Sequence, residues 1–100
     1  MAAIGQKQLS VTAAAQSLTT LCGLSPGRRF NSADFIVLTG SETVYGGGST
    51  VTNVPANAGF KVTSTLAYTL PDSMGFQGWH TDNIYLVGTG SCTVLANFLE

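Results

Sequence analysis

Residues 84–98 read IYLVGTGSCTVLANF and carry the clearest secondary-structure signal in the chain. They contain two compact apolar runs, one at 84–87 and one at 93–98, separated by Gly88-Thr89-Gly90-Ser91. Val, Ile, Tyr, Phe and Thr are enriched in strands, and short runs of them bounded by Gly and Ser indicate β-structure. The stretch therefore predicts two consecutive strands joined by a tight turn.

Short strand-like runs of the same kind recur through the rest of the chain. Apolar and polar residues alternate over 9–13, 60–64 and 66–70, which is the period-2 pattern of a strand with one buried face. Clusters of Gly, Pro, Asn, Asp and Ser separate the runs, at residues 25–27, 39–41, 46–48, 55–59, 71–73 and 88–91. This spacing predicts an all-β, single-domain β-sandwich, jelly-roll-like, with seven to eight short strands. We expect the triple glycine at 46–48 to serve a turn with positive φ.

The length of the chain bounds its organisation. With 100 residues and 10.3 kDa, it holds one ordinary domain. We expect an N-terminal arm at residues 1–8 and a single sandwich domain at 9–100. A helix over Ala13–Leu21 is the weaker alternative, because nine residues with two threonines and no clear cap make a marginal helix.

The low charge of the chain and the absence of long apolar stretches exclude several classes of function. Charged residues make up 9% of the chain and the net charge is -1, so it is not a basic nucleic-acid-binding module. The N-terminus shows no basic start followed by an apolar run, and no apolar stretch approaches the length of a bilayer span. We therefore expect neither nucleic acid nor membrane as a partner. Cys22 and Cys92 are expected to be reduced, part-buried thiols, with a disulfide left open as the alternative.

The residues offer no catalytic chemistry. His80 is the only histidine, and together with Asp82 it falls short of the three or four ligands that zinc requires. No nucleophile elbow or phosphate-binding loop is present. We expect no catalytic residue, no cofactor and no metal, and a protein that is not an enzyme.

Two short segments stand out as candidates for partner contact. Arg28-Arg29 is the only basic cluster, placed at the exit of a turn where it could pair with a carboxylate or another subunit. Phe76 and Trp79 lie in a glycine-containing segment at 74–82, which either folds back over the core or projects into a partner. The partner-contact candidates are Arg28, Arg29, Phe76 and Trp79. A sugar stacked on Trp79, with Tyr85 or Tyr45 as a further platform, is the alternative use of these aromatic residues.

The order of these features resembles a known group of proteins. It begins with a threonine-rich first strand at 9–21 and an arginine-bearing turn at 26–30. An apolar strand runs into a Gly-rich turn at 36–47, a Pro-Ala-x-Ala-Gly turn occupies 55–59, and a last hairpin spans 84–95. This layout resembles small bacteriophage virion structural proteins of the capsid cement or decoration type. It departs from them at 73–81, which looks like an insertion, and after Val94, where arginine is missing.

The resemblance implies a role without catalysis. It predicts a cement or decoration subunit that self-associates and binds the major capsid shell, located on the virion after assembly in the host cytoplasm. Few charged residues are available to protect sheet edges, so we expect other subunits to cover them in a closed oligomer. A homotrimer is expected by analogy with the local threefold positions of a capsid. The alternatives are a tail, neck or fibre adaptor of the virion and a carbohydrate-binding β-sandwich module.

Overall fold

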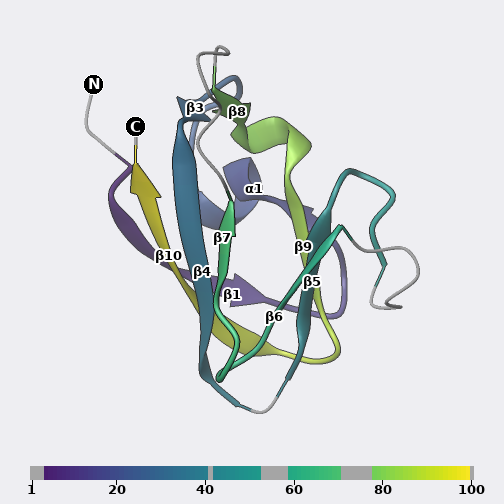
Figure 1. Ribbon diagram of the computed structural model, residues 1–100. Coiled ribbons are helices and arrows are strands. Elements are labelled where there is room, and N and C mark those ends of the chain that lie inside the picture. The colour runs from purple at the N-terminus through teal and green to yellow at the C-terminus, as the bar shows by residue number, and fades with distance from the viewer. Residues whose placement is uncertain (1–3, 41, 53–58, 71–77, 100) are drawn as a thin grey trace.

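Two four-stranded antiparallel sheets face each other in this computed structural model, which describes residues 4–40, 42–52, 59–70 and 78–99 (Figure 1). The first sheet has the order β1-β10-β4-β7, formed by Gln6–Val11, Cys92–Leu99, Ser32–Thr39 and Tyr68–Leu70. The second has the order β2-β9-β5-β6, formed by Gln16–Ser17, Tyr85–Gly88, Val44–Gly47 and Phe60–Val62. The predicted all-β sandwich is confirmed.

The strands pair as one long ribbon that wraps around the core. The pairs β1–β10, β2–β9, β4–β7 and β5–β6 are all antiparallel and nest inside one another along the chain. A further pair, β3 (Arg29–Phe30) with β8 (Trp79–His80), occupies the middle of this series. The pairs β1–β10 and β4–β7 lie in the first sheet, and the pairs β2–β9 and β5–β6 lie in the second. Hydrogen bonds between β10 and β4 connect the two pairs of the first sheet, and those between β9 and β5 connect the two pairs of the second. This is the topology of a jelly roll, as the sequence predicts.

An aromatic row holds the sheets together. Phe60 stacks on Tyr68 with ring centroids 4.2 Å apart, and its other neighbour in the row is Phe35 at 6.0 Å. Phe98 then meets both Phe35 and Phe30 edge-on, at 6.1 and 5.0 Å. Such pairs add about 0.5–1.5 kcal/mol each to the free energy gained by burying the rings. The row belongs to one apolar cluster that draws on both sheets.

Gly46 explains why the row can pass between the sheets. It lies in β5 directly opposite Phe60 in β6, and a Cβ placed on it would lie 2.0 Å from the Phe60 ring. The positive-φ turn expected at 46–48 is wrong, because none of these glycines is among those with positive φ. The glycine is needed for space against an aromatic ring, not for backbone freedom.

The N-terminal part differs from the prediction in two respects. Ile4 is buried and β1 begins at Gln6, so residues 4–8, expected in an arm, belong to the folded domain. The strand expected over 9–21 ends at Val11, and the helix α1 (Leu18–Cys22) follows.

Local capping explains why α1 forms despite its five residues. The Ser17 side chain accepts a hydrogen bond from the Thr20 backbone N–H at the start of the helix, and Gly23 ends it with φ +66. Leu18 is completely buried, so packing against the core stabilises a helix too short to form alone.

The hairpin expected over 84–95 is also wrong, although both of its strands exist. β9 lies in one sheet and β10 in the other, so the turn at 89–91 carries the chain across the sandwich. The same residue types serve a hairpin and a sheet-to-sheet corner, and the sequence signal does not separate them.

The cysteines agree with the expected reduced state. Cys22 is half-buried in α1, Cys92 is buried at the start of β10, and neither forms a disulfide. Burial raises the pKa of the Cys22 thiol to about 11, although the charge of Lys7 lowers it. At neutral pH the Cys22 side chain is therefore a thiol rather than a reactive thiolate.

Candidate functional site

The two segments singled out in the sequence meet at one end of the sandwich. Arg29 lies opposite His80, and Phe30 lies opposite Trp79, in the β3–β8 ribbon (Figure 1). We call this end the tip and define it as residues 23–30 and 78–83, which include the 3-10 helix η2 (Thr81–Asn83). The fold thus brings together residues that are about fifty positions apart in sequence.

Each strand of the ribbon is fixed by a local feature of the sequence. Gly78 precedes β8 with φ +92, and a Cβ there would lie 3.0 Å from the Phe30 carbonyl oxygen. Phe30 itself is buried and packs edge-on against Phe98 in the core. The aromatic row therefore anchors β3, and a glycine allows β8 to approach it closely.

A polar network joins the tip to α1. Asp82 accepts a hydrogen bond from the Thr19 hydroxyl at 2.6 Å and another from the Gly27 N–H at 2.8 Å. The Thr81 N–H donates to the Arg28 carbonyl at 2.9 Å, and the Thr81 hydroxyl lies 2.7 Å from that of Thr19. The Thr81 hydroxyl also reaches the Arg28 carbonyl, at 3.2 Å. These contacts hold the 24–28 turn against η2.

The protons in this network can be assigned by counting donors. Each threonine hydroxyl has one proton to donate. Thr19 gives its proton to the Asp82 carboxylate, so the Thr81 proton is shared between Thr19 Oγ1 and the Arg28 carbonyl. Thr81 is completely buried, and among the described residues it is the only completely buried residue with a polar side chain.

The hydrogen bonds also control the charge of Asp82. Donation from Thr19, then from the Gly27 N–H, and the nearby His80 lower the pKa of the Asp82 carboxyl, and partial desolvation opposes them. These bonds favour the ionised form because a carboxylate is the better acceptor. Asp82 is therefore a structural carboxylate whose two oxygens are both engaged within the tip.

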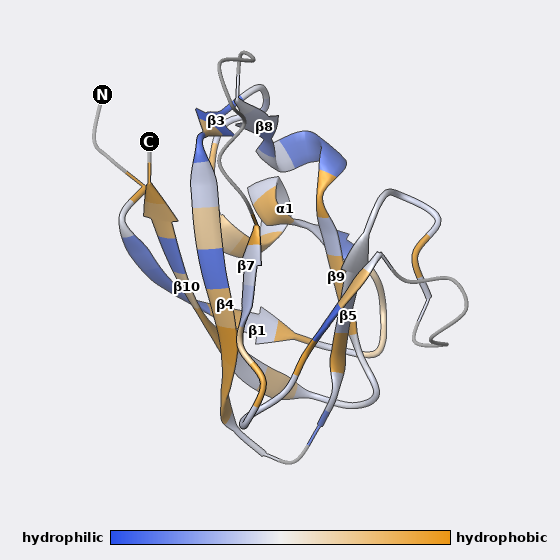
Figure 2. Ribbon diagram, in the orientation of Figure 1, coloured by the Kyte–Doolittle hydropathy of each residue, from blue (hydrophilic) through white to orange (hydrophobic). Residues whose placement is uncertain are grey.

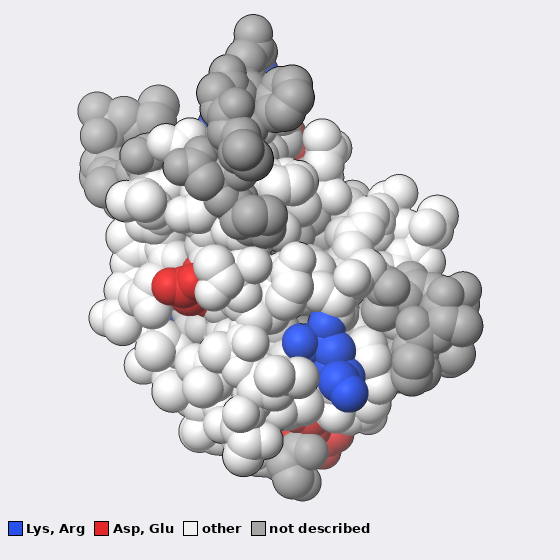
Figure 3. All heavy atoms as spheres, in the orientation of Figure 1, with Lys and Arg blue, Asp and Glu red and all other residues white. Residues whose placement is uncertain are grey.

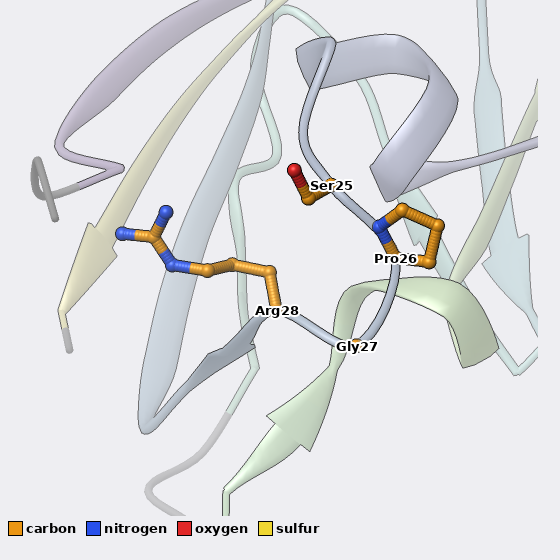
Figure 4. A pocket seen from close by; sticks show the side chains of 4 residues that line it. All are labelled: Ser25, Pro26, Gly27 and Arg28. Atoms are coloured by element: carbon orange, nitrogen blue, oxygen red, sulfur yellow. The ribbon is translucent and has the colours of Figure 1, made fainter.

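A shallow surface hollow of about 180 Å³ opens beside this turn, lined by Ser25, Pro26, Gly27 and Arg28. Figure 4 shows the Arg28 side chain extending past Ser25 and away from the Pro26 ring. Gly27 has φ +83, a conformation that lets the turn present its backbone at the hollow. The hollow is a small feature of the tip, and Arg28 contributes to its lining while its guanidinium points away from Pro26 (Figure 4).

The tip distributes the predicted contact residues unequally. Arg29 is exposed, and Arg28 and Trp79 are half-buried. Trp79 packs against the main core cluster, which agrees with the interpretation that it folds back over the core. Phe76 lies outside the described residues.

Sequence reasoning missed Thr19 and Thr81, the residues that organise the tip. They lie 62 positions apart, and threonine is abundant throughout the chain. No local motif marks such a pair. The contact between Thr19 and Thr81 can be predicted only once the strand order is known, because that order places α1 beside η2.

The described residues contain no cluster suited to metal binding. No group of three or more His, Cys, Asp or Glu side chains gathers within the described ranges. Tyr45, one proposed sugar platform, is only 8% exposed and packs with Val51 and Val87, with Tyr85 against them. The arrangement thus removes Tyr45 as a stacking surface and leaves Trp79 and Tyr85 partly accessible.

The outward face of the first sheet carries several apolar side chains among polar ones, which include the exposed Asp34 of β4. Leu95 and Ile36 are direct neighbours across β10 and β4; both are partly exposed, and Leu38 and Leu99 are 44% and 62% exposed. Figure 2 shows apolar colouring along the lower part of β4. Figure 3 shows only isolated Lys, Arg, Asp and Glu patches on an otherwise uncharged face.

Comparison of the chain with protein-family models, curated proteins and solved structures gave no match. Within the part of the chain that the structure describes, no helix combines the length and the hydropathy that crossing a membrane requires.

Proposed function

We propose that this chain is a non-enzymatic structural subunit of a bacteriophage virion, a cement or decoration protein on the capsid surface. It self-associates and binds the major capsid shell, stabilising the head. The observation that carries the proposal is the combination of a jelly roll with an outward sheet face bearing Ile36, Leu38, Leu95 and Leu99. The exposed Asp34 of β4 lies on the same face, so burial against protein requires a partner for one carboxylate and little other desolvation of charge.

The tip is the surface we assign to the shell. It brings together the exposed Arg29 and the half-buried Arg28 and Trp79 within one small end of the molecule. Arg and Trp are enriched among residues that dominate binding energy at protein interfaces. The Thr19–Thr81–Asp82 network fixes the backbone beneath them, so little ordering is needed when the tip binds.

The test is binding of the purified chain to capsid heads that lack it, measured by co-sedimentation. Arg29→Glu is expected to reduce head binding at least tenfold, since it reverses a charge on the exposed face of the ribbon. Lys61→Glu is the matched control: it makes the same charge change at an exposed residue of β6, outside the tip, and should bind as the unaltered chain does. Equal loss in both variants would assign the effect to net charge and contradict the role of the tip.

Copy number separates the head role from its alternative in the virion. Mass spectrometry of purified particles should find the chain in hundreds of copies if it decorates the shell. A dozen copies or fewer would point to a tail, neck or fibre adaptor. Binding to a glycan array that is lost in Trp79→Ala, with no binding to heads, would favour the carbohydrate-binding module.

A further inference from the structure

β1 is the longest open edge in the described part of the sandwich. The four edge strands are β1, β7, β2 and β6, with six, three, two and three residues. β1 contains no proline, and its register with β10 is continuous from Gln6↔Asn97 to Val11↔Cys92. A long, regular edge is a template for pairing with another strand.

The hydrogen-bond phase of β1 shows which backbone groups face the open side. Phe98 N–H donates to the Gly5 carbonyl at 2.9 Å, and this residue pair continues the β1–β10 register by one position. Hydrogen-bonded pairs recur at every second residue of an antiparallel ladder. Lys7, Leu9 and Val11 therefore bond to β10, whereas the N–H and C=O groups of the intervening residues Gln6, Gln8 and Ser10 point away from the sheet.

The side chains along the open edge are suited to a second copy of themselves. Gln6, Gln8 and Ser10 are exposed and uncharged, so two such edges approach without repulsion between like charges. Lys7, the only charged residue of β1, is half-buried and lies close enough to Cys22 in α1 to influence its thiol. It belongs to the inner face of the strand and leaves the edge itself neutral.

We propose that two copies of the chain associate through β1, antiparallel about a twofold axis that passes beside Gln8. In this register Gln8 pairs with Gln8 of the second copy, and Gln6 pairs with Ser10 on either side. These three pairs offer six backbone hydrogen bonds and join two sheets into one of eight strands. The partner is a second copy because the hydrogen-bond phase of the edge is complementary to itself and its outward side chains carry no like charges.

Neighbouring registers are less favourable, which makes the proposal specific. An axis beside Lys7 leaves only two hydrogen-bonded pairs and sets Lys7 opposite Lys7. An axis beside Leu9 also leaves two such pairs, with Ser10 opposite Gln8. In the Gln8 register Lys7 faces Leu9 of the second copy, so lysine repulsion disfavours the Lys7 register and the smaller number of hydrogen-bonded pairs disfavours the Leu9 register.

This inference specifies the self-association in the proposed function and rests on it. A twofold pair through β1 replaces the trimer expected by analogy. Native mass spectrometry at micromolar concentration should therefore find twice the mass of the 10.3 kDa chain. A monomer or a trimer would overturn the inference. If a monomeric or trimeric chain still bound capsid heads, the proposed shell-binding role would stand although the pairing through β1 would not.

Substitution of the edge tests the surface. Gln8→Pro removes an N–H that points to the open side, a position where an edge strand tolerates proline. It should convert the dimer to a folded monomer, with the circular dichroism spectrum unchanged. Gln8→Thr is the matched control, because it keeps the N–H and favours a strand, and it should remain a dimer. A Gln8→Pro chain that stays dimeric would place the interface elsewhere.

Cysteine cross-linking tests the register independently of folding defects. Directly paired residues lie about 5.5 Å apart at Cα, within the range that a disulfide spans. Gln8→Cys should form a cross-linked dimer under mild oxidation. Gln6→Cys and Ser10→Cys should each cross-link poorly alone but efficiently when mixed. Cross-linking of Gln6→Cys alone, at the level of Gln8→Cys, would overturn the register.

Discussion

The body of the sandwich and the tip are held by different kinds of interaction. In the body, nested strands are fixed by the aromatic row from Tyr68 to Phe30 and by a glycine that makes room for it. At the tip, Phe30 and Trp79 tie the two-residue strands of the ribbon to the core, and threonine hydroxyls and one carboxylate fix the turn and η2 beside them. A short strand pair therefore persists where its own apolar residues reach the core and side chains satisfy the backbone of the adjoining turn.

The largest effect is expected from removing the centre of the aromatic row. Phe35 is completely buried and contacts both Phe60 and Phe98. Phe35→Ala should lower the free energy of unfolding by about 3–5 kcal/mol, because it removes apolar contact and leaves a cavity. Urea denaturation followed by fluorescence measures this. A loss below that caused by the tip variants would contradict the view that the row dominates stability.

A second test adds one methyl group to the body. Gly46→Ala should cost about 1–3 kcal/mol, since the new Cβ would overlap the Phe60 ring and displace it from its stack on Tyr68. Gly48→Ala is the matched control, because nothing lies within 4 Å of a Cβ at that exposed position. Thermal unfolding of both variants compares them. Equal melting temperatures would show that the ring can move aside without loss.

At the tip, the expected effect of losing one hydroxyl is smaller. Thr81→Val keeps the shape of the side chain and removes its contacts with Thr19 and the Arg28 carbonyl. The free energy of unfolding should fall by about 1 kcal/mol. Thr81→Ser, which retains the hydroxyl, should recover most of that loss. If serine is no better than valine, packing of the methyl group matters more than the hydrogen bonds.

The smallest effect is expected from acid, and it should be confined to the tip. The lowered pKa of Asp82 means that its charged form is favoured in the folded state. Its stabilisation is complete above the ordinary value of 3.8 and is lost as the pH falls below that value through the folded-state pKa. The protection of the Gly27 N–H, which donates to Asp82, should fall over that window when its hydrogen exchange is compared with the intrinsic rate at each pH. Asp82→Asn should abolish the pH dependence, and an unchanged profile would exclude Asp82 as its source.

The sequence predicted the body better than the tip, for a physical reason. Alternation within 60–64 and 84–98 is a local signal of a half-buried strand, so the sandwich could be derived from it. The Gly46–Phe60 contact and the corner at 89–91 depend on which strands meet, and period-2 spacing does not specify that. The α1 cap at Ser17 was readable in principle, but five helical residues gave too short an apolar pattern to be recognised.

The candidate site also has a part that the sequence predicted and a part that only the fold reveals. Arg28, Arg29 and Trp79 were selected by residue type, which is independent of the fold. That Arg29 would lie opposite His80, and Phe30 opposite Trp79, follows only from the nested topology. Thr19 and Thr81 had no distinguishing local signal, because a buried threonine pair looks like any other two threonines until the strands are placed.

The nested pairing also sets an order in which the chain can fold. Gly46 and Phe60 of the innermost pair are 14 positions apart, whereas Gln6 and Asn97 of the outermost pair are 91 apart. Closing the outer loop first would cost about 1.7 kcal/mol more in chain entropy than closing the inner one. Once an inner pair exists, each next pair closes only a short additional segment. Folding is therefore expected to begin at β5–β6 and to add the outer pairs one after another, with β1 the last strand to join the sheet.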